Sequence, residues 1–540
     1  MRKVVVYSGT RNVYKDIFVS LNTLLAHTKV DKVYLLLEDD EIPKYMNLEF
    51  PDVCEIINVS NQNYFHSSSP NYTSAWTYMA LLKVVLPDIL RNEDVVLHLD
   101  IDTIVMQDIS DLWEVDLGNN YFAAVREPKK STHGYTYCNV GVCLLNLKQM
   151  RKTGVWKTIV SELNTYHYHF PEQDSMAQFC QNYIKVLPGD YNVSPWTDKA
   201  DEVKIIHLAG YSEWRYRPEW RKVSGEIDGD FVLFMSDRKL ERAENIKAVW
   251  DAYDGNKAFV THSAFRENQS VRDSGYKLVV GDDFSIGAKA PVIMIDHGCS
   301  GGKTYGLNQP NPYFTREDAK IIAYATTSST ETISLTAKEC GIPEDKVIPT
   351  GMPRTDAYFG VKKGDGNTLL ADKRAYLYCP TFRTFNKGVM PDLDFDLLDE
   401  LLTDDEIFAV KMHMVTGDIM LPDYEHIVVL PSSEPSTPYL IDCDVLVTDY
   451  SSILFDAHIL KKPVVLFEKD HEKYLAERGM YFKYPDEYAS RHCRTERDLV
   501  DMLRSAQKPQ KADEQCRKRS TGACDGHSVE RTIDLIRSVL

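Results

Sequence analysis

The sequence lacks several features that would place it in a specialised class. It has no C-x-x-C pair, and its eleven cysteines are scattered, so neither a disulfide framework nor a zinc site is indicated. No apolar run reaches the roughly 18 residues that a membrane-spanning helix needs. The start, MRKVVVYSGTRNVY, enters a strand pattern directly and shows no apolar segment of a signal peptide. We therefore expect a cytoplasmic protein whose cysteines are buried thiols.

Positive charge is also scarce. The formal net charge is −18 at pH 7, which argues against nucleic acid as the main partner. One stretch, RSAQKPQKADEQCRKRSTG, is the exception, and it collects Arg504, Lys508, Lys511, Arg517, Lys518 and Arg519. We expect a solvated loop there, with contact to an anionic membrane surface as the alternative.

A chain of 540 residues is too long for one hydrophobic core. Strand-like runs alternate with helical segments in three successive series, which predicts an α/β architecture of three units. The predicted parts are a first domain at residues 1–235, a helical connector at 236–255, two units facing each other across a cleft at 256–365 and 366–525, and a C-terminal helix at 526–540.

The segment VVLHLDIDTIVMQDI ends a strand-like run in two carboxylates, Asp100 and Asp102. Residues two apart on a strand point to the same side. Like charges that close cost free energy unless something positive offsets them. Two carboxylate oxygens suit magnesium or manganese, which can also bridge two phosphates. An Asp-rich turn without a metal is the alternative, because D-x-D alone is common.

Further segments accompany this pair in a recognisable order. They are TRNVY at 10–14, Lys83 within MALLKVVLP, YCNVGVCLLNL at 137–147, PEQD at 171–174 and IIHLAGYSEW at 205–214. Together with LDID they resemble glycosyltransferase family 8 over about residues 1–230. This resemblance implies a GT-A fold and a retaining enzyme that takes a sugar from a UDP-sugar.

By this resemblance, Asp100, Asp102 and His207 hold Mn2+ or Mg2+, which binds the diphosphate. Gln173 and Asp174 are expected to flank the anomeric carbon as catalytic residues. Tyr14 is expected to stack on uracil, and Asn139 and Gly141 to lie beside the sugar. The UDP-sugar contacts implied in this way are Ser8, Tyr14, Lys83, Asn139, Gly141 and Gly210.

Two positions depart from the family pattern. Lys83 stands where the family commonly has Arg, which keeps the charge but loses the fork geometry. Glu213 replaces the phosphate-binding Lys of the family's H-x-x-G-x-x-K-P-W ending, and Arg215 or Arg217 is expected to substitute for it. If neither does, the first domain is an acceptor-binding module rather than an enzyme.

A second constellation follows in the other half. In DVLVTDYSSILFDAHIL an apolar run ends at Asp449, and a helical pattern follows Ser451 and Ser452. Serines favour helix starts, and such a start at the carboxyl edge of a sheet can seat a phosphate. A plain capped helix is the alternative. Other strand ends carry cations or imidazoles that would suit a diphosphate, with core histidines as the alternative for two of them; these are His297, Arg354, Arg383, Lys411 and His413.

The segments MIDHGCSGGKTYG, TGMPRTD, CPTFR, KMH, VTDYSSILFD and EKDHEKYLAERG resemble the CDP-glycerol:poly(glycerophosphate) glycerophosphotransferases of teichoic acid synthesis, over about residues 255–500. The resemblance implies a GT-B-like fold with His297 as the general base. The implied CDP-glycerol contacts are Lys303, Arg354, Asp356, Arg383, His413, Thr448, Asp449, Ser451 and Ser452. Where the family often reads H-G-x-P-x-K, this chain has HGCSGGK, which is expected to affect the choice of acceptor or alditol.

The expected fold class is therefore α/β, with an N-terminal GT-A-like domain followed by a GT-B-like pair of Rossmann-type domains. We expect a bifunctional enzyme that alternately adds a hexose from a UDP-sugar and glycerol phosphate from CDP-glycerol to a growing or lipid-linked acceptor, as in teichoic acids or capsules. Peripheral contact with the inner face of the plasma membrane is left open. The alternatives are that only the glycerophosphotransferase half is catalytic, or that the chain is a non-enzymatic scaffold, against which the intact LDID, PEQD and TDYSS argue.

Overall fold

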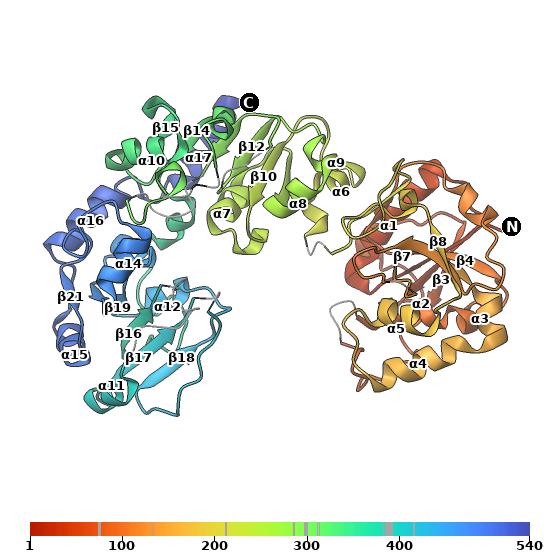
Figure 1. Ribbon diagram of the computed structural model, residues 1–540, viewed down its shortest axis with the longest axis horizontal. Coiled ribbons are helices and arrows are strands. Elements are labelled where there is room, and N and C mark those ends of the chain that lie inside the picture. Colours follow the sequence, from red (N-terminus) through yellow and green to blue (C-terminus); the bar gives the residue numbers. More distant parts are fainter. Residues whose placement is uncertain are drawn as a thin grey trace. The chain divides into compact units, whose positions relative to one another are not determined.

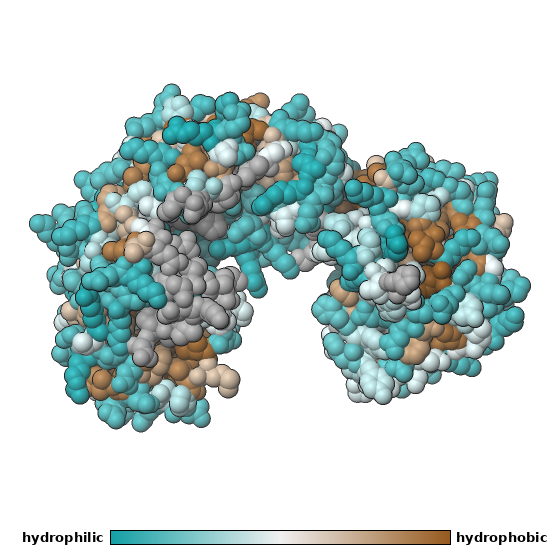
Figure 2. All heavy atoms as spheres, in the orientation of Figure 1, coloured by the Kyte–Doolittle hydropathy of each residue, from teal (hydrophilic) through white to brown (hydrophobic). Residues whose placement is uncertain are grey.

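The chain forms two compact units in a computed structural model, Met1–Glu226 and Ile227–Leu540 (Figure 1). The described residues are 1–73, 77–132, 134–210, 213–283, 287–295, 301–309, 312, 314–381, 383, 393–413 and 416–540. Among them no helix combines the length and apolarity needed to cross a membrane. The cysteines among these residues are free thiols, buried except for Cys54, as expected. Hydrophilic residues cover most of the face shown in Figure 2.

The first unit is built on a seven-stranded sheet of order β3-β2-β1-β4-β7-β6-β8, and β7 runs antiparallel to both of its neighbours. A two-stranded antiparallel sheet of β5 and β9 adds to it. Its strands are β1 (Val4–Ser8), β2 (Lys32–Leu37), β3 (Cys54–Asn58), β4 (Val95–Leu99), β5 (Thr103–Val105), β6 (Phe122–Arg126), β7 (Cys138–Asn146), β8 (Ile184–Leu187) and β9 (Ile205–His207). Its α-helices are α1 (Tyr14–His27), α2 (Thr77–Ile89), α3 (Leu147–Thr153), α4 (Val155–Thr165), α5 (Pro171–Phe179) and α6 (Pro218–Val223).

Helices cover both faces of the first sheet, which is why its strands are apolar without alternation. Val4 and Val6 of β1 pack on the side of α2, α4 and α5, whereas Val5 and Tyr7 pack on the side of α1. β1 lies between β2 and β4, so the strand order reverses between β1 and β4. Ligands of α/β sheets gather outside the carboxyl ends of strands at such a point.

The second unit contains two parallel six-stranded sheets. Its strands are β10 (Val232–Ser236), β11 (Lys257–Thr261), β12 (Leu278–Gly281), β13 (Val292–Met294), β14 (Ile322–Thr326), β15 (Val347–Ile348), β16 (Arg374–Cys379), β17 (Glu406–Lys411), β18 (Ile427–Leu430), β19 (Val445–Thr448), β20 (Val464–Phe467) and β21 (Arg491–Cys493). Its α-helices are α7 (Glu244–Ala252), α8 (His262–Glu267), α9 (Gln269–Arg272), α10 (Ile333–Cys340), α11 (Phe395–Leu401), α12 (Thr437–Asp442), α13 (Ile453–Ile459), α14 (His471–Arg478), α15 (Glu496–Ser505), α16 (Lys511–Thr521) and α17 (Ser528–Val539).

The two sheets have the orders β11-β10-β12-β13-β14-β15 and β18-β17-β16-β19-β20-β21. The second order is that of the doubly wound dinucleotide-binding fold, and its switch point lies between β16 and β19. Both faces of this sheet are covered, because alternate residues of β16 join different cores: Leu377 packs with α13 and Tyr378 with α15. Three α/β sheets in series were predicted, and the α/β class is confirmed.

The structure corrects the boundary expected at residue 235. The first unit ends at Glu226, and β10, which we had placed at the end of the first domain, pairs with β11 and β12 in the second unit. The segment after it, expected as a helical connector, contains the short 3-10 helix η6 (Leu240–Arg242) and α7. α7 packs against α17 and against the 3-10 helix η11 (Pro353–Tyr358). β10 is buried at every position, so its residues do not alternate between apolar and polar. Without this alternation the sequence pattern does not distinguish a strand from a helix.

The basic stretch is not the solvated loop that we expected. Residues 511–521 form α16, which begins with a capping box between Gln510 and Asp513. Arg517 forms an ion pair with Glu514, and Arg519 is paired with Glu487. Because these cations have acidic partners, less of the positive charge is open to a membrane surface.

The G-x-P-R-x-D motif holds the second unit together. Arg354 of η11 forms a 2.8 Å ion pair with Asp456 of α13. Asp356 accepts hydrogen bonds from the backbone N–H groups of Ser528 and Val529, at 3.0 and 2.7 Å, at the start of α17. Both residues were expected to bind CDP-glycerol. In this structure their charged groups make contacts with α13 and α17, and a contact with CDP-glycerol stays a prediction.

Replacing Asp356 by Ala is expected to destabilise α17. Two N–H groups of its first turn lose their acceptor, a loss of about 1 to 2 kcal/mol for a helix cap. Hydrogen exchange of the α17 amides should therefore accelerate roughly 5- to 30-fold. The exposed Asp345 provides the matched control, Asp345→Ala. Unchanged exchange in Asp356→Ala would show that the carboxylate does not cap the helix.

The carboxyl group of Glu406, at the start of β17, is expected to make the stability of the fold depend on pH. Burial alone would raise the pKa of its carboxyl, but hydrogen bonds from Arg504, Tyr376 and Thr403 lower that pKa to about 2. A carboxyl with a lowered pKa stabilises the fold above its unfolded value near 4.5, and this contribution is lost as the pH falls toward 2. We expect Glu406→Gln to cost on the order of 2 kcal/mol at pH 7. The difference from wild type should shrink between pH 5 and 3, as measured by urea unfolding. A difference that stays constant over this range would contradict it.

Candidate functional site

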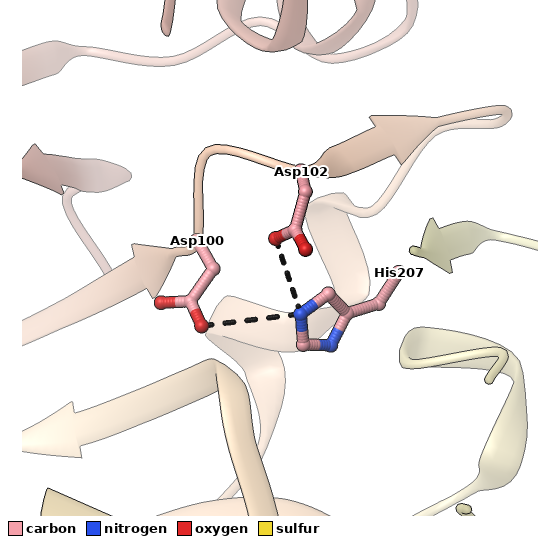
Figure 3. Close-up of side chains that lie close together, drawn as sticks. All are labelled: Asp100, Asp102 and His207. Atoms are coloured by element: carbon pink, nitrogen blue, oxygen red, sulfur yellow. Dashed lines mark ion pairs between the residues drawn. The ribbon is translucent and has the colours of Figure 1, made fainter. Parts of the chain in front are cut away.

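The first candidate site gathers three residues at the carboxyl edge of the first sheet. Asp100 follows β4, Asp102 precedes β5, and His207 ends β9, where it lies opposite Thr103. His207 Nε2 is 3.3 Å from Asp102 Oδ1 and 3.9 Å from Asp100 Oδ2 (Figure 3). One ligand atom of each residue lies within 4.8 Å of the other two. The structure thus brings together the predicted set, and two carboxylates with one imidazole fit a divalent cation such as Mn2+.

An amide orients the imidazole of this set. His207 Nδ1 lies 3.0 Å from Asn192 Oδ1, to which it donates, so the lone pair of Nε2 faces the carboxylates. Asn192 in turn donates to Asn139 Oδ1 at 2.9 Å. Burial alone would lower the pKa of His207, but Asp102 and Asp100 offset it and leave the pKa raised. A cation bound at these carboxylates would therefore compete with a proton on His207.

Lys83 holds Asp100 in place. Its buried ammonium donates to Asp100 Oδ1 at 3.1 Å and to the carbonyl oxygen of Val140 at 2.8 Å. Burial alone would lower the pKa of Lys83, but Asp100 and Glu172 offset it and the pKa is raised. Lys83 was expected among the UDP-sugar contacts, and the structure shows it as an internal partner of a metal-ligand candidate.

His98, which the sequence analysis did not select, lies beside this pair. Its Nδ1 is 3.6 Å from Asp100 Oδ1, and its Nε2 is 3.4 Å from Ser8 Oγ. Burial and the charge of Lys83 lower the pKa of His98 to about 3, so its ring is neutral. The sequence could have identified His98, because it lies two residues before Asp100 and side chains at that spacing in an extended segment point to the same side. Ser8, one of the predicted UDP-sugar contacts, ends β1.

Glu127 links two predicted residues and was also missed. Its Oε1 accepts from the side-chain amides of Asn139, at 3.0 Å, and Gln173, at 3.1 Å. Gln173 Oε1 accepts from the backbone N–H of Val140 at 3.1 Å. The amide of Gln173 is thus engaged at both ends, and it positions α5 against β7. An isolated acid after a strand gave no reason to select Glu127 from the sequence.

Asp174 is bound to its own loop. One carboxylate oxygen accepts from the hydroxyl of Tyr137 and the other from the backbone N–H of Phe170, at 2.8 Å. Burial and this hydrogen bond raise the pKa of Tyr137. The described contacts of Asp174 thus fix the start of α5.

Two glycines are required by close approach. A Cβ on Gly141 would lie 2.0 Å from Cε1 of His207, so a side chain there would displace the imidazole. Gly210 has φ +77° and lies against the indole of Trp196, which would be 2.8 Å from an added Cβ. The half-exposed Trp196 therefore borders the segment that follows His207.

Tyr14 does not have the environment expected for a base-stacking residue. Its side chain is 0% exposed, and its hydroxyl donates to Asp39 and accepts from the backbone N–H of Glu38. A ring with no exposed face cannot stack on uracil, so the structure corrects this prediction. The reason is helix geometry: Tyr14 opens α1 and points into the core, whereas Val13 before it stays partly exposed.

The arginines near Glu213 are paired. Arg215 makes a bidentate contact with Asp16, with distances of 3.1 and 2.6 Å to Asp16 Oδ2. Arg217 is buried and bonds Glu219 at 2.8 Å. Of the two, the half-exposed Arg215 is the better placed to substitute for the missing lysine.

The second candidate site lies at the switch point between β16 and β19. Thr448 Oγ1 donates to the carbonyl oxygen of Cys379 at 2.6 Å. Asp449 Oδ1 accepts from the backbone N–H groups of Thr381 and Tyr450, at 2.8 and 2.6 Å. Thr448 and Asp449 are fully buried, so they shape the turn after β19 and have no surface for a ligand.

Arg383 is an internal partner of the same turn. Its guanidinium is 1% exposed, bonds Asp449 at 2.7 Å and contacts Asp470 through two nitrogens at 2.6 and 3.0 Å. It also lies 5.0 Å from the ring centroids of Tyr450 and Tyr474. We expected Arg383 to hold the diphosphate. In this structure its donors contact carboxylates, and its role toward a diphosphate stays a prediction.

Cations from both sheets of this unit converge near His413. The charges of Arg238, after β10, and of Lys303 and Lys411 act on this exposed histidine, and together with partial burial they lower its pKa. Lys303 Nζ lies 5.6 Å from the ring centroid of Tyr474. Arg238 was not selected from the sequence, because only the tertiary structure brings β10 and β17 to one place.

Ser451 and Ser452 lie where the sequence predicted, immediately before α13. Ser451 is partly exposed and Ser452 is exposed, so both hydroxyls can reach a ligand at this edge. The predicted general base, His297, lies outside the described residues.

Comparison with known proteins supports two different halves. A family model described as CDP-Glycerol:Poly(glycerophosphate) glycerophosphotransferase matches residues 222–538, and one described as Glycosyl transferase family 8 matches residues 4–214. Both resemblances inferred from the motifs are confirmed, and so is the α/β class with a GT-A-like part before a GT-B-like pair.

Curated relatives match over part of their length. The chain is 26% identical over 376 residues to the teichoic acid poly(ribitol-phosphate) polymerase of Bacillus spizizenii, covering 62% of this chain and 58% of that protein. It is 27% identical over 225 residues to the teichoic acid glycerol-phosphate primase of Bacillus subtilis, covering 39% of this chain and 59% of that protein. The chain thus spans less than two thirds of the length of these relatives.

Solved structures resemble each half separately. The wall teichoic acid polymerase TagF aligns with 60% of this chain and 93% of its own, at 18% identity and a TM-score of 0.49. The galactosyltransferase LgtC aligns with 42% of this chain and 96% of its own, at 18% identity and a TM-score of 0.33.

The hydrogen bond to His207 predicts an effect of Asn192. In Asn192→Ala the imidazole loses the acceptor that holds it toward the carboxylates, so affinity for Mn2+ should fall about 10- to 100-fold. Titration calorimetry of the metal-free protein would measure this, with Asn63→Ala as an exposed control in the same unit. Equal affinities in all three proteins would exclude a role for Asn192 in orienting His207.

Proposed function

The chain belongs to the CDP-glycerol:poly(glycerophosphate) glycerophosphotransferase family, and on that premise we propose that it is a bifunctional synthase of a surface polymer. Its second unit would transfer glycerol phosphate, or a related alditol phosphate, from a CDP-activated donor. Its first unit would transfer a hexose from a UDP-sugar with retention. Alternation of the two steps would build a chain of glycosyl-alditol phosphate units, as in teichoic acids or teichoic-acid-like capsules.

One observation carries this proposal. Each unit has, at the switch point of a sheet, polar groups that suit a nucleotide diphosphate, and these groups differ. The first has Asp102 and His207, which suit a cation, and the second has Ser451, Ser452 and His413, with further cations beside them. Two donor sites of different chemistry in one chain fit two transfer reactions.

In the first unit, Asp100, Asp102 and His207 would hold Mn2+ or Mg2+. The cation, when bound, would offset the charge of the departing nucleotide diphosphate. Asn192 would keep His207 turned toward it, and Arg215 would supply the phosphate contact that Glu213 cannot. Gln173 and Asp174 would flank the anomeric carbon, held there by Glu127 and Tyr137.

In the second unit, Ser451, Ser452, His413 and Lys303 would hold the diphosphate of CDP-glycerol. His297 would accept the proton of the acceptor hydroxyl. The acceptor oxygen then bonds to the phosphorus that carries glycerol, the bond between the two phosphates breaks, and CMP leaves. Such a transfer needs mainly positioning and charge stabilisation, which this set of residues would provide.

The acceptor would be a growing or lipid-linked chain of sugar and polyol phosphate. Each product end would be the substrate of the other unit, and tethering the two units raises their effective concentration. Such an acceptor would place the enzyme at the inner face of the plasma membrane through peripheral contact.

A second function is favoured by the residues near Glu213. Both nearby arginines have carboxylate partners, Asp16 and Glu219. If Arg215 does not leave Asp16, the first unit would bind the acceptor sugar without transferring one, and only the glycerophosphotransferase half would be catalytic.

The two functions are separated by product formation. Wild type, Asp102→Ala and His297→Ala would be incubated with Mn2+, a panel of UDP-sugars, CDP-glycerol or CDP-ribitol, and a short synthetic glycerol-phosphate glycoside. We expect a ladder from the wild type. Because the acceptor ends in one kind of group, the variant that lacks the first transfer should give no product, and the other variant should stall after a single addition. Mass spectrometry would identify the products.

Asp94→Ala, which removes an exposed aspartate of the same unit, is the matched control and should give the wild-type ladder. A ladder from Asp102→Ala, with none from His297→Ala, would leave the first unit as a binding module. If both variants still consume both donors, both proposed sites are excluded.

A further inference from the structure

A second group of metal-ligating side chains lies in the second unit, away from the candidate donor site. Asp404, Glu425 and His426 each offer one ligand atom, and these atoms lie within 4.8 Å of one another. Asp404 precedes β17, and the other two directly precede β18. The strands are parallel neighbours, with Phe408 opposite Ile427, so the group meets at their amino edge. The candidate donor site lies at the opposite, carboxyl edge.

His426 is the buried member of this group. Its side chain is 8% exposed, and within the described residues its Nδ1 has no hydrogen-bond partner. A buried polar atom left without a partner costs about 1 to 3 kcal/mol. A ligand that binds at this ring would remove that cost.

The backbone around His426 is fixed. The N–H groups of Glu425 and His426 donate to the carboxylate of Asp399, at 3.3 and 2.8 Å. The carbonyl oxygen of His426 accepts from the N–H of Phe408 at 2.8 Å. With its backbone held on both sides, the ring is presented to the two carboxylates without further folding, which is a preorganised arrangement for a metal.

The carboxylates of Asp404 and Glu425 are exposed, and among the described residues neither forms an ion pair. The nearby Lys373 donates to the backbone carbonyl oxygen of Asp404, at 3.1 Å, and not to its carboxylate. More acids lie close by: Asp405 and Asp423 are near in the sequence, and Asp396 and Asp399 accept hydrogen bonds from Tyr424 and from the backbone N–H of Glu425. Negative charge concentrated in this way is stabilised by a bound cation.

The chain between β17 and β18 gives such a cation a structural role. Parallel strands are usually joined by a helix, but no helix is assigned in the described part of residues 412–426. In its described part, the hydroxyl of Tyr424 ties this irregular segment to α11 by donating to Asp396 at 2.8 Å. A cation on Asp404, Glu425 and His426 would tie its end to the turn before β17.

We propose that Asp404, Glu425 and His426 form a second divalent-cation site, which is structural and separate from the cluster of Asp100, Asp102 and His207. Two carboxylates and one imidazole select a transition-metal dication such as Mn2+ or Zn2+ over Ca2+.

Manganese binding to the full chain tests the proposal. Metal-stripped protein is titrated with Mn2+, and free Mn2+ is followed by electron paramagnetic resonance. The double variant Asp404→Asn/Glu425→Gln should bind one ion fewer than the wild type. The variant Asp102→Asn should lose a different ion, and the combined variant should lose both.

The matched control is Asp405→Asn/Asp423→Asn, which removes two negative charges from the same region but leaves the three ligands intact. It should bind as many ions as the wild type. Equal stoichiometry in both double variants would overturn the proposal, as would loss of the ion in the control alone.

A second measurement does not depend on stoichiometry. Adding Zn2+ should slow hydrogen exchange in residues 412–426 of the wild type and of Asp102→Asn, but not of His426→Gln. Slowing that persists in His426→Gln would overturn the assignment of His426 as a ligand. Because the exposed acids do not contribute to the core, the carboxylate variants should fold.

Discussion

In each unit a fully buried cation holds an aspartate at the switch point of a sheet. Lys83 binds Asp100 after β4, and Arg383 binds Asp449 after β19. A charge removed from water must be paired and hydrogen-bonded, and a misplaced partner is costly. The two loops that carry the candidate ligand groups therefore have little freedom. The remaining groups, which are exposed at both edges, take their positions from these pairs.

The same constraint explains why two of the predicted cations have internal partners. Lysine can stand in for arginine at position 83 because a compact ammonium can donate to a carboxylate and a carbonyl oxygen at once. Arg383 instead donates from its planar guanidinium to two aspartates, Asp449 and Asp470. Each of these two cations thus fixes an aspartate in the loop that also carries a proposed ligand residue, Asp102 in the first unit and Ser451 in the second.

Amide side chains and helix caps hold residues that lie further from these two aspartates. Asn192, Asn139 and Glu127 form a hydrogen-bonded chain that reaches from His207 to Gln173. In the second unit, Asp356 ties the start of α17 to the region that links the two sheets. Geometry at both edges is thus maintained by uncharged or internally paired groups, so the proposed donor groups can stay open to solvent.

The sequence by itself determined the α/β class, the order of the units and the residues at the ends of the central strands, because these follow from local patterns of apolar residues. It brought Asp100, Asp102 and Ser451 into consideration by position alone. The tertiary structure decided which polar groups have internal partners, as for the guanidinium groups of Arg354 and Arg383 and the hydroxyl of Tyr14, since burial and pairing depend on partners far along the chain. It also decided the extent of β10, whose fully buried run has no alternation, and the proximity of His426 to Asp404, which precede different strands.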